Sequence, residues 1–254
     1  MEKISATIIA LNEEKRIAAC LESLRDVAEE VIVVDSGSTD ATVSICHNYG
    51  CKVTLRPFDG FGAQRQYATS LTTHQHVLSI DADEVLSPAL RESIIALKET
   101  GFTHRVYSMS RLNFYCGYPV KRCGWYPDHQ IRLFDKRYAA WNLRDVAEKV
   151  IFRDSVRPEP LDGDILHYRC DTPDQFRKVT RTHAAIKARV LAASDEPISP
   201  VAPMLNGLKA FWNVYINRGG ILEGNVGRQI ARESYESEYL AYRAAQKLNA
   251  QRRK

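Results

Sequence analysis

The chain has 254 residues, of which 44% are hydrophobic and 26% are charged, and its formal net charge is +4. The length is sufficient for one large α/β domain, alone or with a helical extension, and the composition is that of an ordinary globular protein, so disorder is not the default expectation. The basic residues gather towards the C-terminus without a nucleic-acid recognition motif, so we expect no nucleic-acid partner.

Three further features concern the compartment. No apolar run is long enough to span a bilayer. The six cysteines have no paired metal-site spacing, and the N-terminal residues enter a strand-like segment instead of an export signal. We therefore expect a cytoplasmic protein with reduced thiols.

Short apolar runs alternate with helical patterns in the first part of the chain. The pattern predicts strands at 5–10, 30–35, 52–55 and 77–81, and helices at 14–25, 38–49 and 63–71. The run 30–35 is continuous and β-branched, as expected of a strand covered on both faces. This alternation predicts an α/β fold with a mostly parallel central sheet and helices on both faces.

The alternation ends near Gly101. Strands predicted at 105–111 and 130–134 flank an aromatic, Gly- and Pro-rich stretch, which is typical of loops that form pockets. Beyond residue 171 the pattern is helical, at 172–193, 203–216 and 227–248. We therefore predict two domains: a catalytic domain over 1–170 and a C-terminal helical extension over 171–254 that packs on it.

Two carboxylates follow the last strand of the alternating part. Asp81 and Asp83 come at the end of the apolar run 77–80, and side chains two residues apart in an extended segment point the same way. Converging carboxylates favour a hard cation, Mg²⁺ or Mn²⁺, that bridges to a diphosphate. A turn before a helix cap at Ser87 is the alternative interpretation.

Polar residues also end the first two strands. Asp35 ends the second, where it can accept a hydrogen bond from a ribose hydroxyl or a base N–H. Ser38 and Thr39 open a helix whose N-terminus favours anions, although Ser38 also fits an ordinary N-cap. The first strand ends in the polar run 10–14. Acids at three successive strand ends predict a nucleotide site at this rim of the sheet.

Together these segments resemble the family-two glycosyltransferases, which have the GT-A (Rossmann-like) fold. The resemblance rests on Ile9-Ala10-Leu11-Asn12-Glu13-Glu14, Val34-Asp35-Ser36-Gly37-Ser38-Thr39-Asp40 and Asp81-Ala82-Asp83-Glu84. Two later segments, within 125–134 and 215–227, resemble the branch of lipopolysaccharide core β-glucosyltransferases. The resemblance implies an inverting transfer of a hexose, glucose in that branch, from a UDP-sugar to a lipopolysaccharide inner-core or related glycan acceptor.

The resemblance also implies roles for individual residues. Asp83 would ligate Mn²⁺ or Mg²⁺, and His167 would complete the metal shell or touch the diphosphate, unless it is a structural histidine at a strand end. Arg65 would reach the phosphates, unless it is an exposed helix residue. The residues that would bind the nucleotide sugar are Ala10, Asn12, Glu14, Asp35, Arg65, Asp81, Ala82 and Asp83.

An inverting transferase needs a base that takes the proton of the acceptor hydroxyl. The candidates are Glu148 and Asp128. Glu148 follows Ala147, where relatives of this branch have histidine, and this departure leaves open a catalytically silent nucleotide-sugar-binding protein. Polyprenyl phosphate or another polysaccharide is the alternative acceptor. The acidic run 11–14 argues against a nucleotidyltransferase, which needs a Gly-rich, basic phosphate loop there.

Apolar and aromatic side chains recur at helical spacing in the C-terminal part. They are Phe211, Trp212, Tyr215 and Ile216, flanked by Lys209 and Arg218. Core packing against the catalytic domain is the simpler interpretation. The alternative is an amphipathic surface that contacts the cytoplasmic face of the inner membrane, where a lipid-linked acceptor would be presented.

Overall fold

The computed structural model describes residues 2–143, 148–153, 155–194 and 197–252. The chain forms two compact units, the first from Met1–Arg111 and Asp128–His167, the second from Leu112–Pro127 and Tyr168–Lys254. It passes from the first unit to the second within two strands, β6 (Val106–Tyr115) and β11 (Glu159–Cys170), and returns to the first between Pro127 and Asp128. The catalytic domain and packed extension predicted with a boundary at residue 170 stay a prediction.

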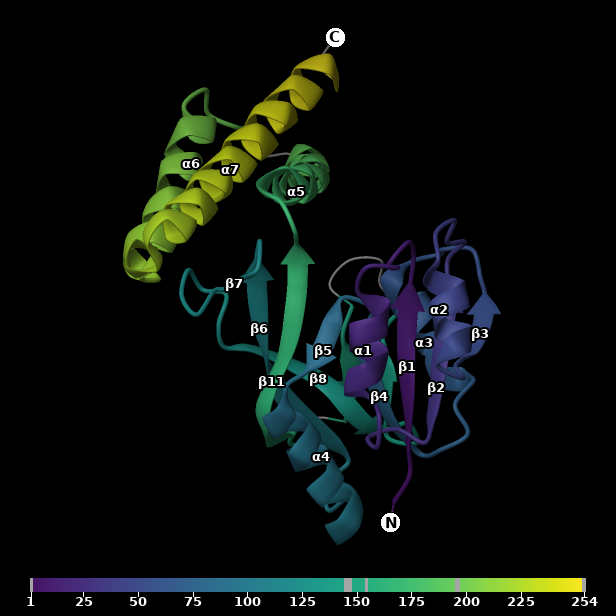
Figure 1. Cartoon of the computed structure of the whole chain (residues 1–254). Helices are drawn as coiled ribbons and strands as arrows, with labels where there is room; N and C mark the ends of the chain where they lie inside the picture. Colours follow the sequence, from purple (N-terminus) through teal and green to yellow (C-terminus); the bar gives the residue numbers. More distant parts are fainter. Residues whose placement is uncertain (1, 144–147, 154, 195–196, 253–254) are drawn as a thin grey trace. The chain divides into compact units, whose positions relative to one another are not determined.

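A mixed sheet forms the centre of the first unit, with strand order β3-β2-β1-β4-β8-β6-β11-β5 (Figure 1). The predicted parallel half is present and consists of β1 (Ile4–Ala10), β2 (Glu30–Asp35), β3 (Lys52–Leu55) and β4 (His76–Asp81). Two further strands, β8 (Asp128–Asp135) and β5 (Glu84–Leu86), pair antiparallel with their neighbours. The sheet is therefore parallel over its first four strands only.

Helices cover both faces of this sheet, as predicted. On one face, residues of α1 (Ile17–Ser23), α2 (Thr42–Asn48) and α4 (Pro88–Thr100) share a buried cluster with the strands. On the other face lie α3 (Phe61–Ser70) and the hairpin of β9 (Ala139–Trp141) and β10 (Val150–Phe152). The helix start predicted at Ser87 is also present, because the Ser87 hydroxyl accepts a hydrogen bond from Leu90 N at 3.3 Å.

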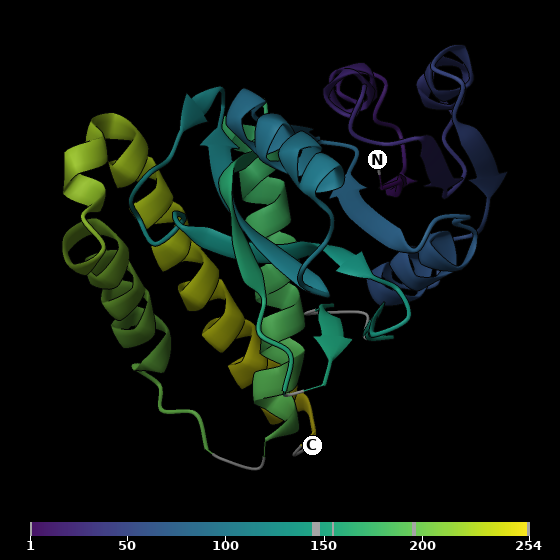
Figure 2. The ribbon, with the colours of Figure 1, turned by 90° about the horizontal axis from the view of Figure 1, so that it is seen from below.

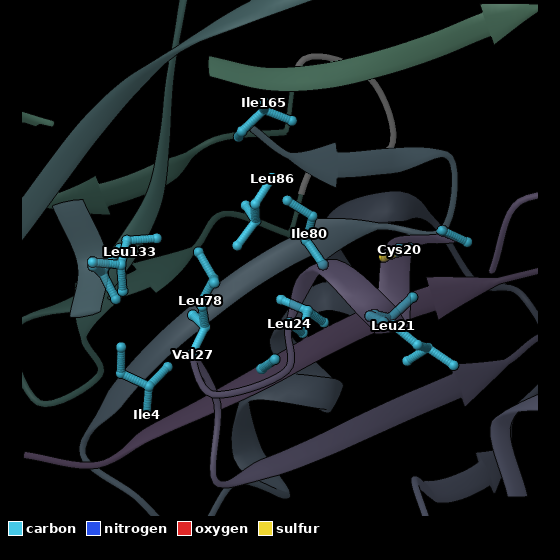
Figure 3. Packing of buried hydrophobic residues seen from close by; sticks show 14 of the residues in the cluster. Ile4, Cys20, Leu21, Leu24, Val27, Leu78, Ile80, Leu86, Leu133 and Ile165 are labelled. Atoms are coloured by element: carbon cyan, nitrogen blue, oxygen red, sulfur yellow. The ribbon is translucent and has the colours of Figure 1, made fainter. Parts of the chain in front are cut away.

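Strand β4 is buried on both faces. Leu78 and Ile80 pack with Cys20 and Leu21 of α1 and with Leu24, which directly follows that helix (Figure 3). Val77, which points to the opposite face of the strand, belongs to a second cluster with Phe134 and Trp141. A strand between two apolar layers has no polar face, which explains the continuous apolar run that precedes Asp81.

The second unit is mostly helical. It contains α5 (Pro173–Ala193), α6 (Ala202–Trp212) and α7 (Gly224–Arg252), and the short strand β7 (Tyr118–Pro119) pairs with the end of β6. Helix α7 packs along both α5 and α6 (Figures 1 and 2). A π turn (Asn213–Asn217) and a 3-10 turn (Gly220–Glu223) join α6 to α7. No helix in the described ranges is long and apolar enough to cross a membrane.

One carboxylate ties four segments of the first unit together. Glu30 Oε1 accepts hydrogen bonds from Ser5 Oγ at 2.5 Å and from Thr73 N at 2.5 Å, and Oε2 accepts from Lys52 Nζ at 2.8 Å. Burial alone would raise the pKa of Glu30, but these donors more than offset it and lower the pKa to about 2. The ionised form of Glu30 therefore stabilises the fold.

We expect Glu30→Gln to lower the free energy of unfolding at pH 7 by about 1–2 kcal/mol, after allowance for solvent screening. The folded pKa lies below the unfolded value, so this stabilisation is complete above about pH 5 and is lost as the pH falls towards 2. Urea unfolding of both proteins across this range measures the difference. The matched control is Glu22→Gln, at an exposed side chain. A difference in the free energy of unfolding between Glu30→Gln and the unmodified protein that stays constant with pH would contradict the prediction.

Candidate active site

A cavity of about 460 Å³ lies at the carboxyl ends of β1 and β4 in the first unit. Ligands bind at this edge in open α/β sheets. Seven residues predicted from the sequence line the cavity: Ala10, Arg65, Asp81, Ala82, Asp83, Glu148 and His167. A second cavity of about 480 Å³ is lined by residues of α1 and the 48–51 turn, but its carboxylates Glu29 and Glu30 are both paired with lysines. The first cavity is therefore the candidate active site.

The two acids at the end of β4 have different partners. Asp81 is the last residue of the strand, whereas Ala82 and Asp83 form a turn before β5. Both carboxylates line the same cavity, but only Asp81 reaches it from the extended segment that the sequence predicted, and Asp83 reaches it from the turn. Asp81 contacts two arginines and Asp83 contacts His167.

Asp81 is held between two guanidinium groups. Its Oδ1 lies 2.6 Å from Arg65 Nη2, and its Oδ2 accepts a hydrogen bond from Arg132 Nη2 at 2.9 Å. Burial alone would raise the pKa of Asp81, but Arg65 and Arg132 more than offset it and hold the pKa well below its usual range. Asp81 is therefore ionised at any physiological pH, and its charge is already compensated by the protein.

Asp83 faces a histidine from a distant part of the chain. Its Oδ2 lies 3.2 Å from His167 Nε2, and both side chains are partly accessible from the cavity. His167 comes from β11, which pairs with β5 in a register that sets His167 opposite Glu84. Among the described residues no group of three His, Cys, Asp or Glu side chains could hold a metal ion. To a bound cation, Asp83 would supply one oxygen ligand and His167 one nitrogen ligand.

Beneath the cavity lies a buried ion pair. Glu84 is fully buried, and its Oε1 accepts hydrogen bonds from Arg132 Nη2 at 3.0 Å and from Arg111 Nη1 at 3.2 Å. Its other oxygen accepts from the backbone N of Asp81 at 2.9 Å. Burial alone would lower the pKa of Arg132, but Glu84 and Asp81 raise it instead. Glu84 therefore fixes both the backbone and the countercharge of Asp81.

These contacts form a chain of alternating charges that connects the two candidate bases. Its members, in order, are Asp128, Arg111, Glu84, Arg132, Asp81, Arg65 and Glu148. The two ends differ. Asp128 accepts from Arg111 Nε at 2.8 Å and from Gln130 Nε2 at 2.6 Å, whereas Glu148 Oε1 lies 3.8 Å from Arg65 Nη2 and lines the cavity.

Arg65 has unused hydrogen-bonding capacity. It is not the exposed helix residue of the alternative interpretation, since only 4% of it is accessible and its guanidinium carbon lies 4.9 Å from the centre of the Trp141 ring. Within the described ranges, its Nε and Nη1 have no hydrogen-bond partner. Buried donors normally have an acceptor, so the site has capacity for a further anionic oxygen.

Three predicted nucleotide-binding residues accept hydrogen bonds from backbone N–H groups of the loop after β2. Asp35 Oδ1 accepts from the backbone N of Gly37 and Ser38, at 3.0 and 2.8 Å. Asn12 Oδ1 accepts from Thr39 N at 2.8 Å, and Glu14 Oε2 accepts from Ala41 N at 3.1 Å. Asn12 and Glu14 thus connect the end of β1 to the loop after β2, whereas Asp35 holds that loop to the end of its own strand. The predicted contact of these side chains with a nucleotide stays a prediction.

Other residues at the site were not singled out from the sequence. Glu13, Ser36, Phe58, Phe61 and Arg111 line the cavity, and Glu84 and Arg132 lie beneath it. The available signal was a charged residue between apolar neighbours in a strand, as Arg132 is between Ile131 and Leu133 of β8. Such a residue needs a buried countercharge, but the sequence does not say which acid supplies it.

The family described as "Glycosyl transferase family 2" matches residues 5–148, which is more than half of the chain. The chain belongs to glycosyltransferase family 2. The family predicted from the sequence is therefore confirmed, and with it the α/β GT-A fold. Because the matched segment contains the strand ends that build the cavity, the candidate active site lies largely within the family domain.

Individual relatives extend this result. An uncharacterized glycosyltransferase of Rickettsia typhi is 38% identical over 215 residues, 78% of this chain and 71% of that protein. The lipopolysaccharide core biosynthesis glycosyltransferase LpsC of Rhizobium meliloti is 28% identical over 195 residues, 73% of this chain and 70% of that protein. The resemblance to lipopolysaccharide core glycosyltransferases is thus supported by a named relative.

A solved structure is also similar over part of the chain. It is glucosyl-3-phosphoglycerate synthase from Mycobacterium tuberculosis, in complex with Mn²⁺, UDP and glucosyl-3-phosphoglycerate. The sequence identity is 25%, the TM-score is 0.37, and the similarity covers 44% of each chain.

We expect Arg132→Met to lower the free energy of unfolding by about 3–5 kcal/mol, because it leaves Glu84 buried without its main countercharge. Urea unfolding at pH 7 measures the loss, and an unchanged m-value would show that the denatured state is unaffected. The control is Arg25→Met, whose ion pair with Glu22 is exposed and contributes at most about 1 kcal/mol. Equal losses in the two variants would contradict the prediction.

Proposed function

We propose that the chain is an inverting, metal-dependent hexosyltransferase that transfers glucose from UDP-glucose to a lipopolysaccharide inner-core or related glycan acceptor. The observation that carries the proposal is the cavity in which the Asp83–His167 pair, Arg65 and Glu148 lie together. The family supports sugar transfer, and the LpsC relative supports a lipopolysaccharide acceptor.

Asp83 and His167 fit a divalent cation that retains other ligands. A carboxylate oxygen and an imidazole nitrogen suit Mn²⁺ and, through the oxygen, Mg²⁺, which usually keeps water and substrate phosphates in its shell. When bound, the cation neutralises the negative charge that builds on the departing diphosphate. The unpaired nitrogens of Arg65 would support the same charge from the protein side.

Glu148 is the better candidate for the base. Its carboxylate lines the cavity and lies 3.8 Å from Arg65 Nη2, beyond hydrogen-bond distance. Asp128 is instead tied to Arg111 and Gln130. Glu148 would take the proton of the acceptor hydroxyl as the oxygen attacks the anomeric carbon, while UDP leaves on the opposite face with the bonding electron pair. This displacement inverts the anomeric configuration.

Asp81 would act as a fixed anion beside the ribose or sugar hydroxyls. Its low pKa keeps it a hydrogen-bond acceptor throughout the reaction. Ala147, the position where related sequences have histidine, lies outside the described residues.

The test is the release of UDP from a panel of UDP-sugars with Mn²⁺, with and without heptose-terminated lipopolysaccharide core. We expect the core to stimulate release from UDP-glucose. Donor binding without stimulated release would point to polyprenyl phosphate or another polysaccharide as acceptor, or to a silent protein, with Ala147→His the next variant. A lack of binding to any nucleotide sugar would overturn the proposal.

We expect Asp83→Ala to weaken Mn²⁺-dependent UDP binding by at least about 100-fold, since loss of a metal ligand costs no less than loss of a group that orients one. Isothermal titration calorimetry with and without Mn²⁺ measures the effect. Asp162→Ala, at an exposed residue outside the cavity, is the matched control and should bind as the unmodified protein does. Full metal-dependent affinity in Asp83→Ala would remove the diphosphate assignment.

We expect Glu148→Gln to keep its affinity for the donor and to lose about 10²–10⁴-fold in kcat, because the amide cannot accept the hydroxyl proton. Titration of UDP-glucose and steady-state transfer assays separate the two effects. Asp128→Asn is the comparison and should lose less. If Asp128→Asn loses transfer while Glu148→Gln retains it, the base is Asp128.

A further inference from the structure

A stripe of large apolar side chains runs along α6 and the π turn that follows it in the second unit. We call it the α6 stripe, and it comprises Val201, Met204, Leu205, Leu208, Trp212 and Ile216. These residues recur every three or four positions, so they lie on one side of the helix. All are exposed, Leu208 to 52% and Trp212 to 60%. Isolated apolar residues are common on surfaces, but a continuous stripe is not.

The opposite side of α6 carries the residues that pack within the unit, and most of them are small. Pro203, Gly207 and Val214 are buried. A Cβ atom on Gly207 would lie 2.9 Å from the Tyr235 ring of α7, so the two helices approach closely there. The distribution is thus reversed relative to an ordinary surface helix, since small residues form the packed side and large apolar residues face outward.

Core packing accounts for two of the four apolar and aromatic residues Phe211, Trp212, Tyr215 and Ile216. Phe211 and Tyr215 are partly buried against the cluster formed by Tyr115, Phe176 and other residues of this unit. Trp212 and Ile216 lie on the exposed stripe. Packing within the unit therefore explains Phe211 and Tyr215 and leaves the stripe unexplained.

The charged residues of the segment 197–222, which contains the stripe, have one sign. From Pro197 to Leu222 the sequence contains no Asp or Glu, and its charged residues are Lys209 and Arg218. Both are exposed. The next acid, Glu223, accepts hydrogen bonds from Tyr118 Oη at 2.8 Å and Lys121 N at 3.0 Å. An apolar surface bordered by cations is complementary to an anionic, apolar partner.

We propose that the α6 stripe binds the surface of an anionic phospholipid bilayer. The helix would lie in the plane of the interface, with its large apolar side chains among the acyl chains and Lys209 and Arg218 at the headgroups. Trp212 has the amphipathic ring that concentrates at this depth. The proposal concerns the second unit alone and does not depend on the donor, metal or acceptor of the transfer reaction.

The test is co-sedimentation of the full chain with vesicles of phosphatidylcholine, with and without 30% phosphatidylglycerol. We expect binding that requires phosphatidylglycerol and weakens with salt. Leu208→Ser with Trp212→Ser should lower the partition coefficient at least about tenfold, because both side chains insert. Lys209→Glu should lower it about fivefold or more on anionic vesicles. Val190→Ser, at an exposed apolar residue of α5, is the matched control and should bind normally.

Tryptophan fluorescence gives a second readout. Trp212 is exposed while Trp141 is buried, so vesicle binding should shift the emission to the blue and brominated acyl chains should quench it. Trp212→Phe should lose both signals and still sediment. Equal binding by the double serine variant and the unmodified protein would overturn the proposal. The proposal would also be overturned if the chain did not bind vesicles but formed concentration-dependent dimers that the double serine variant abolished. The stripe would then bind a second copy of the chain.

Discussion

The candidate active site depends on a buried pair, Glu84 with Arg132, beneath the cavity. Glu84 is fully buried and accepts from the backbone of Asp81, so it fixes the turn that carries Asp83. Arg132 supplies the countercharge of both acids. Such pairs add little net stability compared with apolar residues, but removal of one partner is costly. The pair therefore makes the geometry of this turn a condition of folding.

From this pair, charge compensation extends to the cavity wall. Asp81 is neutralised by Arg65 and Arg132, whereas Asp83 and Glu148, which line the same cavity, lie outside this double ion pair with both arginines. Three acids at one site thus have different environments. The environment of Asp81 suits a fixed hydrogen-bond acceptor, that of Asp83 suits a metal ligand, and that of Glu148 suits a proton acceptor. Neighbouring carboxylates acquire separate roles in this way.

The second unit uses its apolar residues differently from the first. In the first unit the large apolar side chains of β4 and α1 are buried in one cluster. In the second unit small residues pack α6 against α7, and the large apolar residues of the α6 stripe remain exposed. This difference is a property of the sequence around Gly207, because a larger residue there would separate the two helices. The close packing of α6 on α7 at Gly207 is thereby linked to the exposure of the α6 stripe.

The sequence by itself determined the parallel strands, the helices between them and the acids at the strand ends, because these follow from local periodicity and chain order. It also determined the family, through segments such as Asp81-Ala82-Asp83-Glu84. It did not determine the antiparallel strand β5, which has three residues and exists through its pairing with β11. That pairing brings His167 to Asp83 across more than eighty residues of chain. Likewise, only the tertiary structure decided that Arg132 compensates Asp81 and Glu84, since a countercharge is assigned by distance in space and burial, and neither is encoded in local spacing.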